Sequence, residues 1–95
     1  MTEQKDERLS VIELCNYLNS LAALLDSKGL NELAHRINEA SKFASGSPTE
    51  LFGESKIALM EVRSNVQLDF SESELFKLSL VINQIESEFR RIGGG

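Results

Sequence analysis

Apolar residues in the last third of the chain recur at alternating steps of three and four, and this spacing constrains the fold more than any other feature. The residues in this pattern are Leu75, Leu78, Ile82, Ile85, Phe89 and Ile92. On an α-helix they share one face, so the segment must bury that seam against other helices. Ser71 to Glu74 has the spacing of a capping box, and Gly93 is a stop signal. These signals predict a helix over about 72–92.

The first amphipathic segment spans about residues 8–27. Ser10 and Glu13 are spaced as a capping box, and Gly29 is placed for the left-handed position that follows many helices. A helix that begins earlier, near Glu3, and runs through Ser10 is the alternative.

Two further helices are expected between these. One spans about 31–44, with Asn31 as its N-cap. The other spans about 48–65 and follows Ser47-Pro48-Thr49-Glu50, which combines an N-cap serine, a proline at the first helical position and a glutamate that completes a capping box. Gly53 inside this helix would destabilise it by about 1 kcal/mol relative to alanine, so a close approach by a neighbouring helix is expected there.

Four helices joined by short turns predict an all-α fold, a single-domain antiparallel four-helix bundle with up-down-up-down topology over residues 1–95. The core of this bundle is light, because the 95 residues include no tryptophan and one tyrosine. Such a bundle would gain stability from dimerisation.

Charge and composition exclude several classes of protein. The chain has 10 Lys+Arg against 15 Asp+Glu, a net charge of −5, which argues against a nucleic-acid partner. No apolar run approaches the roughly 20 residues of a membrane span, so no membrane association is expected. The polar start MTEQKDER is unlike a signal peptide, and a single cysteine suits a reducing compartment, so a cytoplasmic location is expected.

Residues that could carry catalysis or bind a metal are few. Cys15 lies on an apolar helix face, where a small buried side chain is expected. His35 is the only histidine, and Glu39 at i+4 is placed to hold its ring. We expect no catalytic site, no metal site and no cofactor, and therefore no enzyme.

Oppositely charged residues also recur at a spacing of four. Glu32 with Arg36, and Glu86 with Arg90, are expected to form contacts within their own helices. Such contacts imply no function.

The helix expected over 48–65 carries an acidic stripe on its surface. Its members, within about 60° of one another at 100° per residue, are Glu50, Glu54, Ile57 and Glu61. Phe52 and Met60 lie outside both this stripe and the buried face. The stripe is either an ordinary solvated face or a recognition surface for a basic partner, with an apolar anchor ringed by charge.

The first helix has an apolar arc wider than a narrow seam, because Tyr17 and Leu24 flank it together with Leu21. Burial against two neighbouring helices would explain this width, and so would a homodimer interface.

The segment from Phe43 to Leu59, followed by a helix that ends in Phe89-Arg-Arg-Ile-Gly-Gly94, resembles a pattern in small uncharacterised bacterial helical proteins. In size, acidity and helical content the chain also resembles the immunity proteins of bacterial toxin systems. That resemblance implies a helical inhibitor that binds a toxin and has no activity of its own.

The sequence therefore favours a non-enzymatic protein–protein interaction module, most concretely an immunity protein that neutralises a basic toxin domain. The alternative is a self-associating structural subunit, either a homodimer or a component of a larger bundle.

Overall fold

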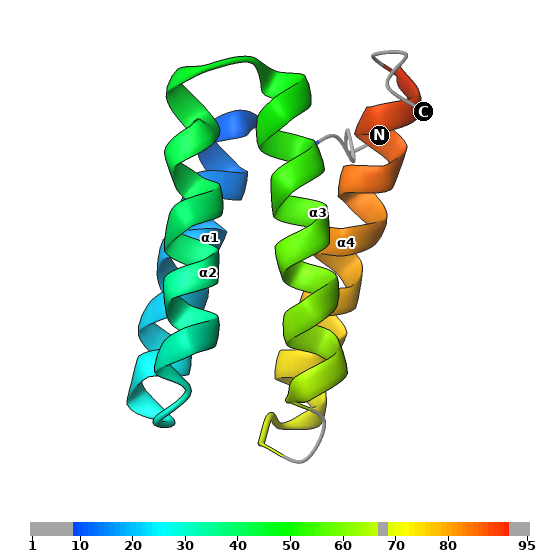
Figure 1. Cartoon of the computed structure of the whole chain (residues 1–95). Coiled ribbons are helices and arrows are strands. Elements are labelled where there is room, and N and C mark those ends of the chain that lie inside the picture. Colours follow the sequence, from blue (N-terminus) through cyan, green and yellow to red (C-terminus); the bar gives the residue numbers. More distant parts are fainter. Residues whose placement is uncertain (1–8, 67–68, 92–95) are drawn as a thin grey trace.

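The computed structural model describes residues 9–66 and 69–91, and every regular element in these ranges is helical (Figure 1). The elements are α1 (Val11–Ser27), α2 (Asn31–Ser41), the 3₁₀ turn η1 (Lys42–Ser45), α3 (Pro48–Asn65) and α4 (Glu72–Arg91). The expected all-α class is confirmed. Ile92, the last residue of the predicted seam, lies outside the described residues.

Three of the four α-helices in the described residues begin directly after an N-cap serine. The Ser10 hydroxyl accepts a hydrogen bond from the Glu13 N–H at 3.0 Å, and the Glu13 carboxylate accepts one from the Ser10 N–H at 3.1 Å. Ser71 and Glu74 form the same reciprocal pair, at 3.2 and 2.8 Å. Ser47 accepts from the N–H of its third following residue at 3.2 Å, but the return bond of a capping box is absent among the described residues.

The extended backbone of Ser10, with φ −83° and ψ 162°, makes this residue the boundary of α1. A helix that runs through Ser10 from Glu3 is therefore wrong, and the expected start near residue 8 was too early.

The end of α1 explains why the cap predicted for α2 is wrong. Gly29 adopts φ +80°, its N–H donates to the Asp26 carbonyl at 3.0 Å, and the Leu30 N–H donates to the Leu25 carbonyl at 2.9 Å. This Schellman ending turns the chain so tightly that Leu30 is already the N-cap of α2. Asn31 is the first helical residue, and its side chain donates back to the Asp26 carboxylate at 2.7 Å.

α2 ends at Ser41 rather than at residue 44. The Ser41 hydroxyl donates to the Asn38 carbonyl at 2.7 Å, and the backbone then tightens into η1. Serine hydroxyls compete for helical carbonyls, and a 3₁₀ turn advances about 120° per residue instead of 100°. Ala44, the last residue of the helix expected over 31–44, consequently lies in η1 and is exposed.

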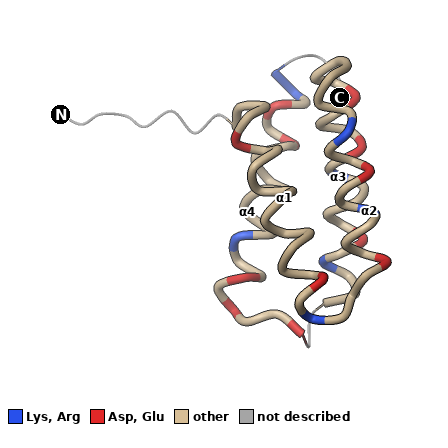
Figure 2. Tube along the Cα trace, turned by 90° about the vertical axis from the view of Figure 1, so that its left-hand side faces the viewer, with Lys and Arg blue, Asp and Glu red and all other residues tan. Residues whose placement is uncertain are grey.

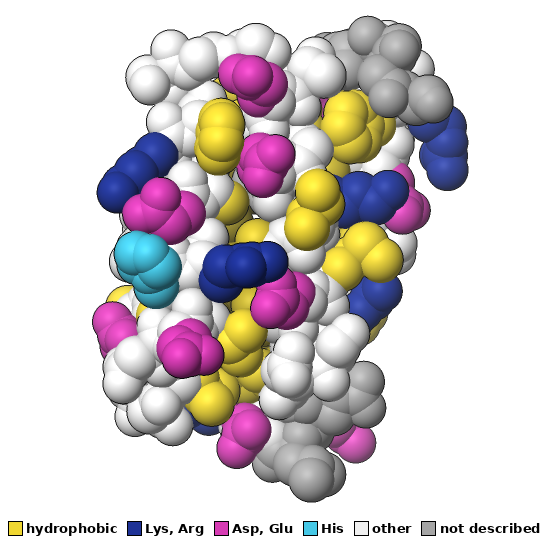
Figure 3. Space-filling view, in the orientation of Figure 1, with side chains coloured by type: hydrophobic (Ala, Val, Ile, Leu, Met, Phe, Trp, Pro, Cys, Tyr) yellow, Lys and Arg dark blue, Asp and Glu magenta, His cyan; other side chains and the backbone are white. Residues whose placement is uncertain are grey.

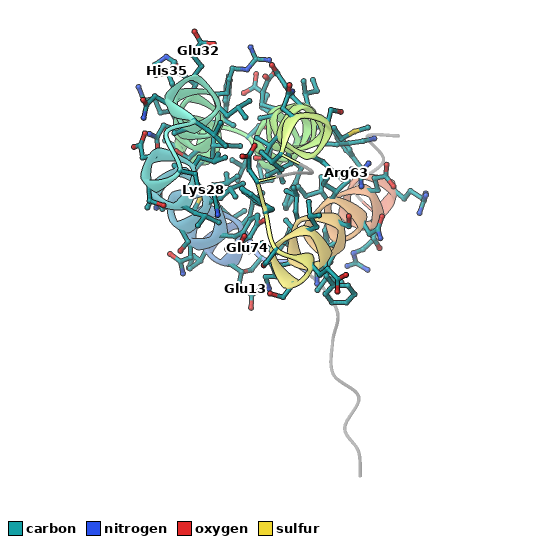
Figure 4. The ribbon with its side chains drawn as sticks, turned by 90° about the horizontal axis from the view of Figure 1, so that it is seen from below. Glu13, Lys28, Glu32, His35, Arg63 and Glu74 are labelled. Atoms are coloured by element: carbon teal, nitrogen blue, oxygen red, sulfur yellow. The ribbon has the colours of Figure 1, made fainter. Side chains whose placement is uncertain are left out.

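The helices lie in two pairs. α2 and α3 are at the front of Figure 1, with α1 and α4 behind them, and the view from below in Figure 4 shows the same arrangement. α1 packs on α2, α2 on α3 and α3 on α4. The largest side chains in the core between them are fully buried: Leu14, Leu18, Leu25, Ile37, Leu51, Leu59, Val62, Val66, Leu78, Val81, Ile82 and Ile85.

Two local contacts join α4 to the rest of the fold, in addition to its packing on α3. A Cβ added at Gly53 of α3 would lie 3.2 Å from Cζ of Phe89, which confirms the expected close approach of a neighbouring helix at this glycine. Glu88, a buried carboxylate of α4, accepts a hydrogen bond from the Leu9 N–H at 3.3 Å and thereby ties α4 to the residue that precedes the Ser10 cap. None of the helices in residues 9–66 and 69–91 combines the length and the hydropathy that a membrane-spanning segment requires.

Candidate functional site

The acidic stripe lies on the surface of α3. Glu50 and Glu54 are exposed, Glu61 is half-buried, and Ile57 leaves 59% of its surface exposed between the carboxylates. Of the two large apolar residues placed outside the stripe, Met60 is exposed but Phe52 is buried.

Arg36 of α2 donates a hydrogen bond to the Glu61 carboxylate and forms an ion pair with it across the two helices. The expected pairing of Arg36 with Glu32 inside α2 is therefore wrong. The other expected pair fails in the same way, because Glu86 lies 3.4 Å from Lys56 of α3 and is not paired with Arg90. Long side chains on packed helices reach the neighbouring helix, and helical spacing alone does not reveal this.

α2 forms the second side of a groove that runs along the acidic stripe, which we call the α2–α3 groove. A lower hollow of about 650 Å³ and an upper hollow of about 320 Å³ make up this groove. Arg36 lines both. The remaining lining residues are Leu30, Asn31, Glu32, Leu33, His35, Glu61 and Asn65 below, and Glu39, Ala40, Phe43, Glu54, Ile57 and Ala58 above. Figure 3 shows acidic and apolar side chains interspersed over this face.

Glu39 sits at the α2 rim of the upper hollow with two basic neighbours. Its carboxylate accepts a hydrogen bond from Lys42 Nζ at 3.0 Å and lies 3.8 Å from Nε2 of His35, the residue expected to pair with it. The hydrogen bond and the charge of Lys42 hold the pKa of Glu39 below its usual value. Figure 4 shows Glu32 and His35 projecting outward from α2, away from the core.

The face made by α2 and α3 carries an excess of negative charge. On the groove side its carboxylates are Glu32, Glu39, Glu50, Glu54 and Glu61, and its cations are Arg36 and Lys42. The other cations of α3, Lys56 and Arg63, are turned toward Glu86 and Ser79 of α4. Among the described residues, Glu32, Glu50 and Glu54 make no ion pair. Glu50 and Glu54, the carboxylates of the stripe without an ion pair among the described residues, lie on the same helix face as the exposed Ile57 and can attract a cationic surface.

A second groove separates α1 from α4. It consists of hollows of about 540 and 230 Å³ that share Tyr17 and Ser20 of α1 and Lys77 of α4. Tyr17 is half-buried, and this burial raises the pKa of its phenol to about 12. Between Glu13 and Asp26 α1 carries no charged residue, which leaves it plain in the charge-coloured trace of Figure 2.

Cys15 and His35, the candidates for catalysis or metal binding, lie on different helices. Cys15 of α1 is a half-buried free thiol that packs against the hydrophobic core, and His35 is exposed on α2. Within residues 9–66 and 69–91, no three His, Cys, Asp or Glu side chains gather closely enough to hold a metal ion.

Sequence reasoning found one side of the α2–α3 groove and missed the other. Glu39 follows Arg36 at a spacing of three in α2, so these two residues share a helical face, and Phe43 follows them in η1. That signal was present, but it becomes a site only when α2 is known to lie beside the stripe. No known family model, curated protein or solved structure matches this chain.

Proposed function

We propose that this protein is a non-enzymatic interaction module that binds a basic protein partner through the α2–α3 face. Its scaffold is an antiparallel four-helix bundle of up-down-up-down topology. The observation that carries the proposal is Ile57, which is 59% exposed between the carboxylates of Glu54 and Glu61 and opens onto a groove. Protein interfaces commonly combine an apolar centre with a polar rim, and Ile57 with its neighbouring carboxylates has this arrangement.

The partner's chemistry follows from the charge of this face. Unpaired carboxylates attract a cationic surface, accelerate its approach and disfavour an anionic one. The most concrete form of this function is an immunity protein of a bacterial cytoplasm, which captures a basic toxin domain and covers the surface that the toxin uses on nucleic acid. Ile57 would then pack into the interface after the charges have brought the two proteins together.

The test is affinity capture from a lysate of the source cells with the charge-reversed bait E50K/E54K. These positions are better than Glu61, because a lysine at 61 would face Arg36 and disturb the packing of α2 on α3. The matched control is D69K/E72K, which makes the same change in net charge at exposed residues outside the groove.

A stoichiometric basic partner that is captured by the native chain and the control but lost from E50K/E54K supports the proposal. A partner that binds all three baits equally refutes the assignment of this face. Recovery of the bait's own chain alone refutes the basic partner.

Self-association is a second candidate function, and the groove between α1 and α4 favours it. This groove contains the half-buried Tyr17 and Leu24, with the carboxylate of Glu74 and the ammonium of Lys77 at its margin. Groups of both signs around an apolar strip can pair with a second copy of the same surface. Light scattering over a dilution series tests this, because a chain that stays monomeric at every concentration excludes it.

A further inference from the structure

The lower and upper hollows of the α2–α3 groove have a similar arrangement of facing residues. Arg36 of α2 faces Glu61 of α3 in the lower hollow, where the two side chains form an ion pair. Seven residues make about two helical turns, so positions seven apart lie nearly in line on one face. Glu54 lies two turns before Glu61 in α3. Phe43 follows Arg36 by seven residues and belongs to η1, which continues from the end of α2. Phe43 and Glu54 both line the upper hollow, so they are the counterparts of the Arg36–Glu61 pair.

The upper pair lacks the cation that the lower pair has. Phe43 stands in place of a basic residue and leaves 36% of its surface exposed. The Glu54 carboxylate makes no ion pair or side-chain hydrogen bond within residues 9–66 and 69–91. Ala40 and Ala58 are buried at the floor of the hollow, and Ile57 adds an exposed aliphatic wall. We call this hollow the Glu54 notch.

We propose that the Glu54 notch accepts an arginine side chain of the basic partner, which takes the position at Glu54 that Arg36 takes at Glu61. This inference rests on the proposed function and names the group that the α2–α3 face recognises. The aliphatic stem of the arginine packs on Ala40, Ala58 and Ile57, and its guanidinium stacks on the Phe43 ring and donates two hydrogen bonds to the Glu54 carboxylate.

Arginine fits this notch better than lysine. A guanidinium is planar and weakly hydrated, so it can stack on an aromatic ring and bind a carboxylate with two parallel hydrogen bonds. An ammonium is a compact, strongly hydrated charge that gains less from the Phe43 ring.

The two cations around the notch are each paired with a carboxylate other than Glu54. Arg36 lies at its lower end, but the Glu61 carboxylate balances its charge. At the upper rim, Lys42 is held by Glu39 at 3.0 Å. Glu54 is therefore the carboxylate of this hollow whose charge remains uncompensated among the described residues.

Two peptides of equal charge test the inference, Ac-Lys-Gly-Arg-Gly-Lys-NH₂ and Ac-Lys-Gly-Lys-Gly-Lys-NH₂. Each is titrated into the ¹⁵N-labelled chain, and the dissociation constant is taken from the amide shifts. We expect the largest shifts at Ala40, Ile57 and Ala58, with the arginine peptide binding about fivefold more tightly than the lysine peptide, the factor that corresponds to one kcal/mol.

Three variants locate the effect. E54Q should weaken the arginine peptide by about fivefold, since one charge-assisted contact of about 1 kcal/mol is lost. F43L keeps an apolar side chain but removes the ring, so the preference for arginine over lysine should disappear. E72Q makes the same chemical change as E54Q at an exposed residue outside the groove and should leave both affinities unchanged.

Amide shifts centred outside the notch would refute the inference. It would also be refuted if the two peptides bind the native chain with equal affinity and F43L changes neither affinity. These outcomes are distinguishable from failure of the proposed function. If E50K/E54K loses the partner while the arginine peptide ignores the notch, the function stands and the arginine site is wrong. If that variant keeps the partner, the α2–α3 face is not the interface.

Discussion

Replacing Ser55 with alanine should stabilise the protein, although Ser55 lies in the middle of its core. The side chain is fully buried on α3, and its hydroxyl makes no hydrogen bond among the described residues. A buried polar group without a partner destabilises a fold by about 1–3 kcal/mol. The alanine also has a higher helix propensity by about 0.5 kcal/mol, while the loss of one oxygen leaves a void smaller than a methyl group, which costs less than about 1 kcal/mol.

The net effect of S55A is a gain of about 1–2 kcal/mol in the free energy of unfolding, from these opposing contributions. Urea denaturation followed by circular dichroism at equilibrium measures this free energy, and the slope against urea should not change. In a thermal scan the midpoint should rise by about 4–8 °C for each kcal/mol in a chain of this size.

S87A is the matched control, because Ser87 is an exposed serine within α4. It reports the helix-propensity gain alone, about 0.5 kcal/mol or less. If S55A stabilises the chain no more than S87A does, or destabilises it, the Ser55 hydroxyl has a partner in the folded protein and the reasoning fails.

Three further predictions concern packing, a buried hydrogen bond and pH. G53A should change stability by less than about 0.5 kcal/mol in the native chain, because its helix-propensity gain is offset by the contact with Phe89; in an F89A background it should stabilise by about 1 kcal/mol. A double-mutant cycle without this difference would contradict the close approach. E88A should lower the free energy of unfolding by about 1–3 kcal/mol because the Leu9 N–H loses its acceptor, whereas E88Q, which keeps one, should lower it less. Equal losses would show that the hydrogen bond is irrelevant. Stability should fall as pH rises from 10 to about 12, because the raised pKa of Tyr17 means that the unfolded chain loses this proton first. Y17F should remove the part of this fall in stability that comes from Tyr17. That part is smaller than about 2.7 kcal/mol, the free energy that corresponds to two pKa units, because the phenol is partly exposed.

The sequence by itself predicted where most of the helices begin. Ser10, Ser47 and Ser71 were identified as caps because an N-cap bond joins residues only three apart, and any chain that becomes helical there can form it. The apolar spacing likewise placed Leu78, Ile82 and Ile85 on the buried face of α4, whereas Leu75 and Phe89 of the same seam are half-buried. These are short-range properties, since side-chain direction on a helix follows from residue number alone.

Predictions from local sequence were wrong where a neighbouring turn or helix determines what a residue contacts. Asn31 has the chemistry of an N-cap, but the tight Schellman turn made it helical and brought its side chain to Asp26. Phe52 lies outside the buried face that was expected for α3, yet its side chain is buried. The buried face of α3 is therefore wider than the sequence predicted.

The candidate site divides in the same way. The acidic stripe could be identified from the sequence, because Glu50, Glu54, Ile57 and Glu61 belong to one helix and share its face. Only the tertiary structure decided that Arg36 neutralises Glu61, since these residues are 25 positions apart and meet through the packing of α2 on α3. The same packing brought Phe43 and Glu54 to one hollow, where the Glu54 carboxylate has no counter-charge among the described residues. A helix determines which of its residues point together, but its neighbour determines what they face.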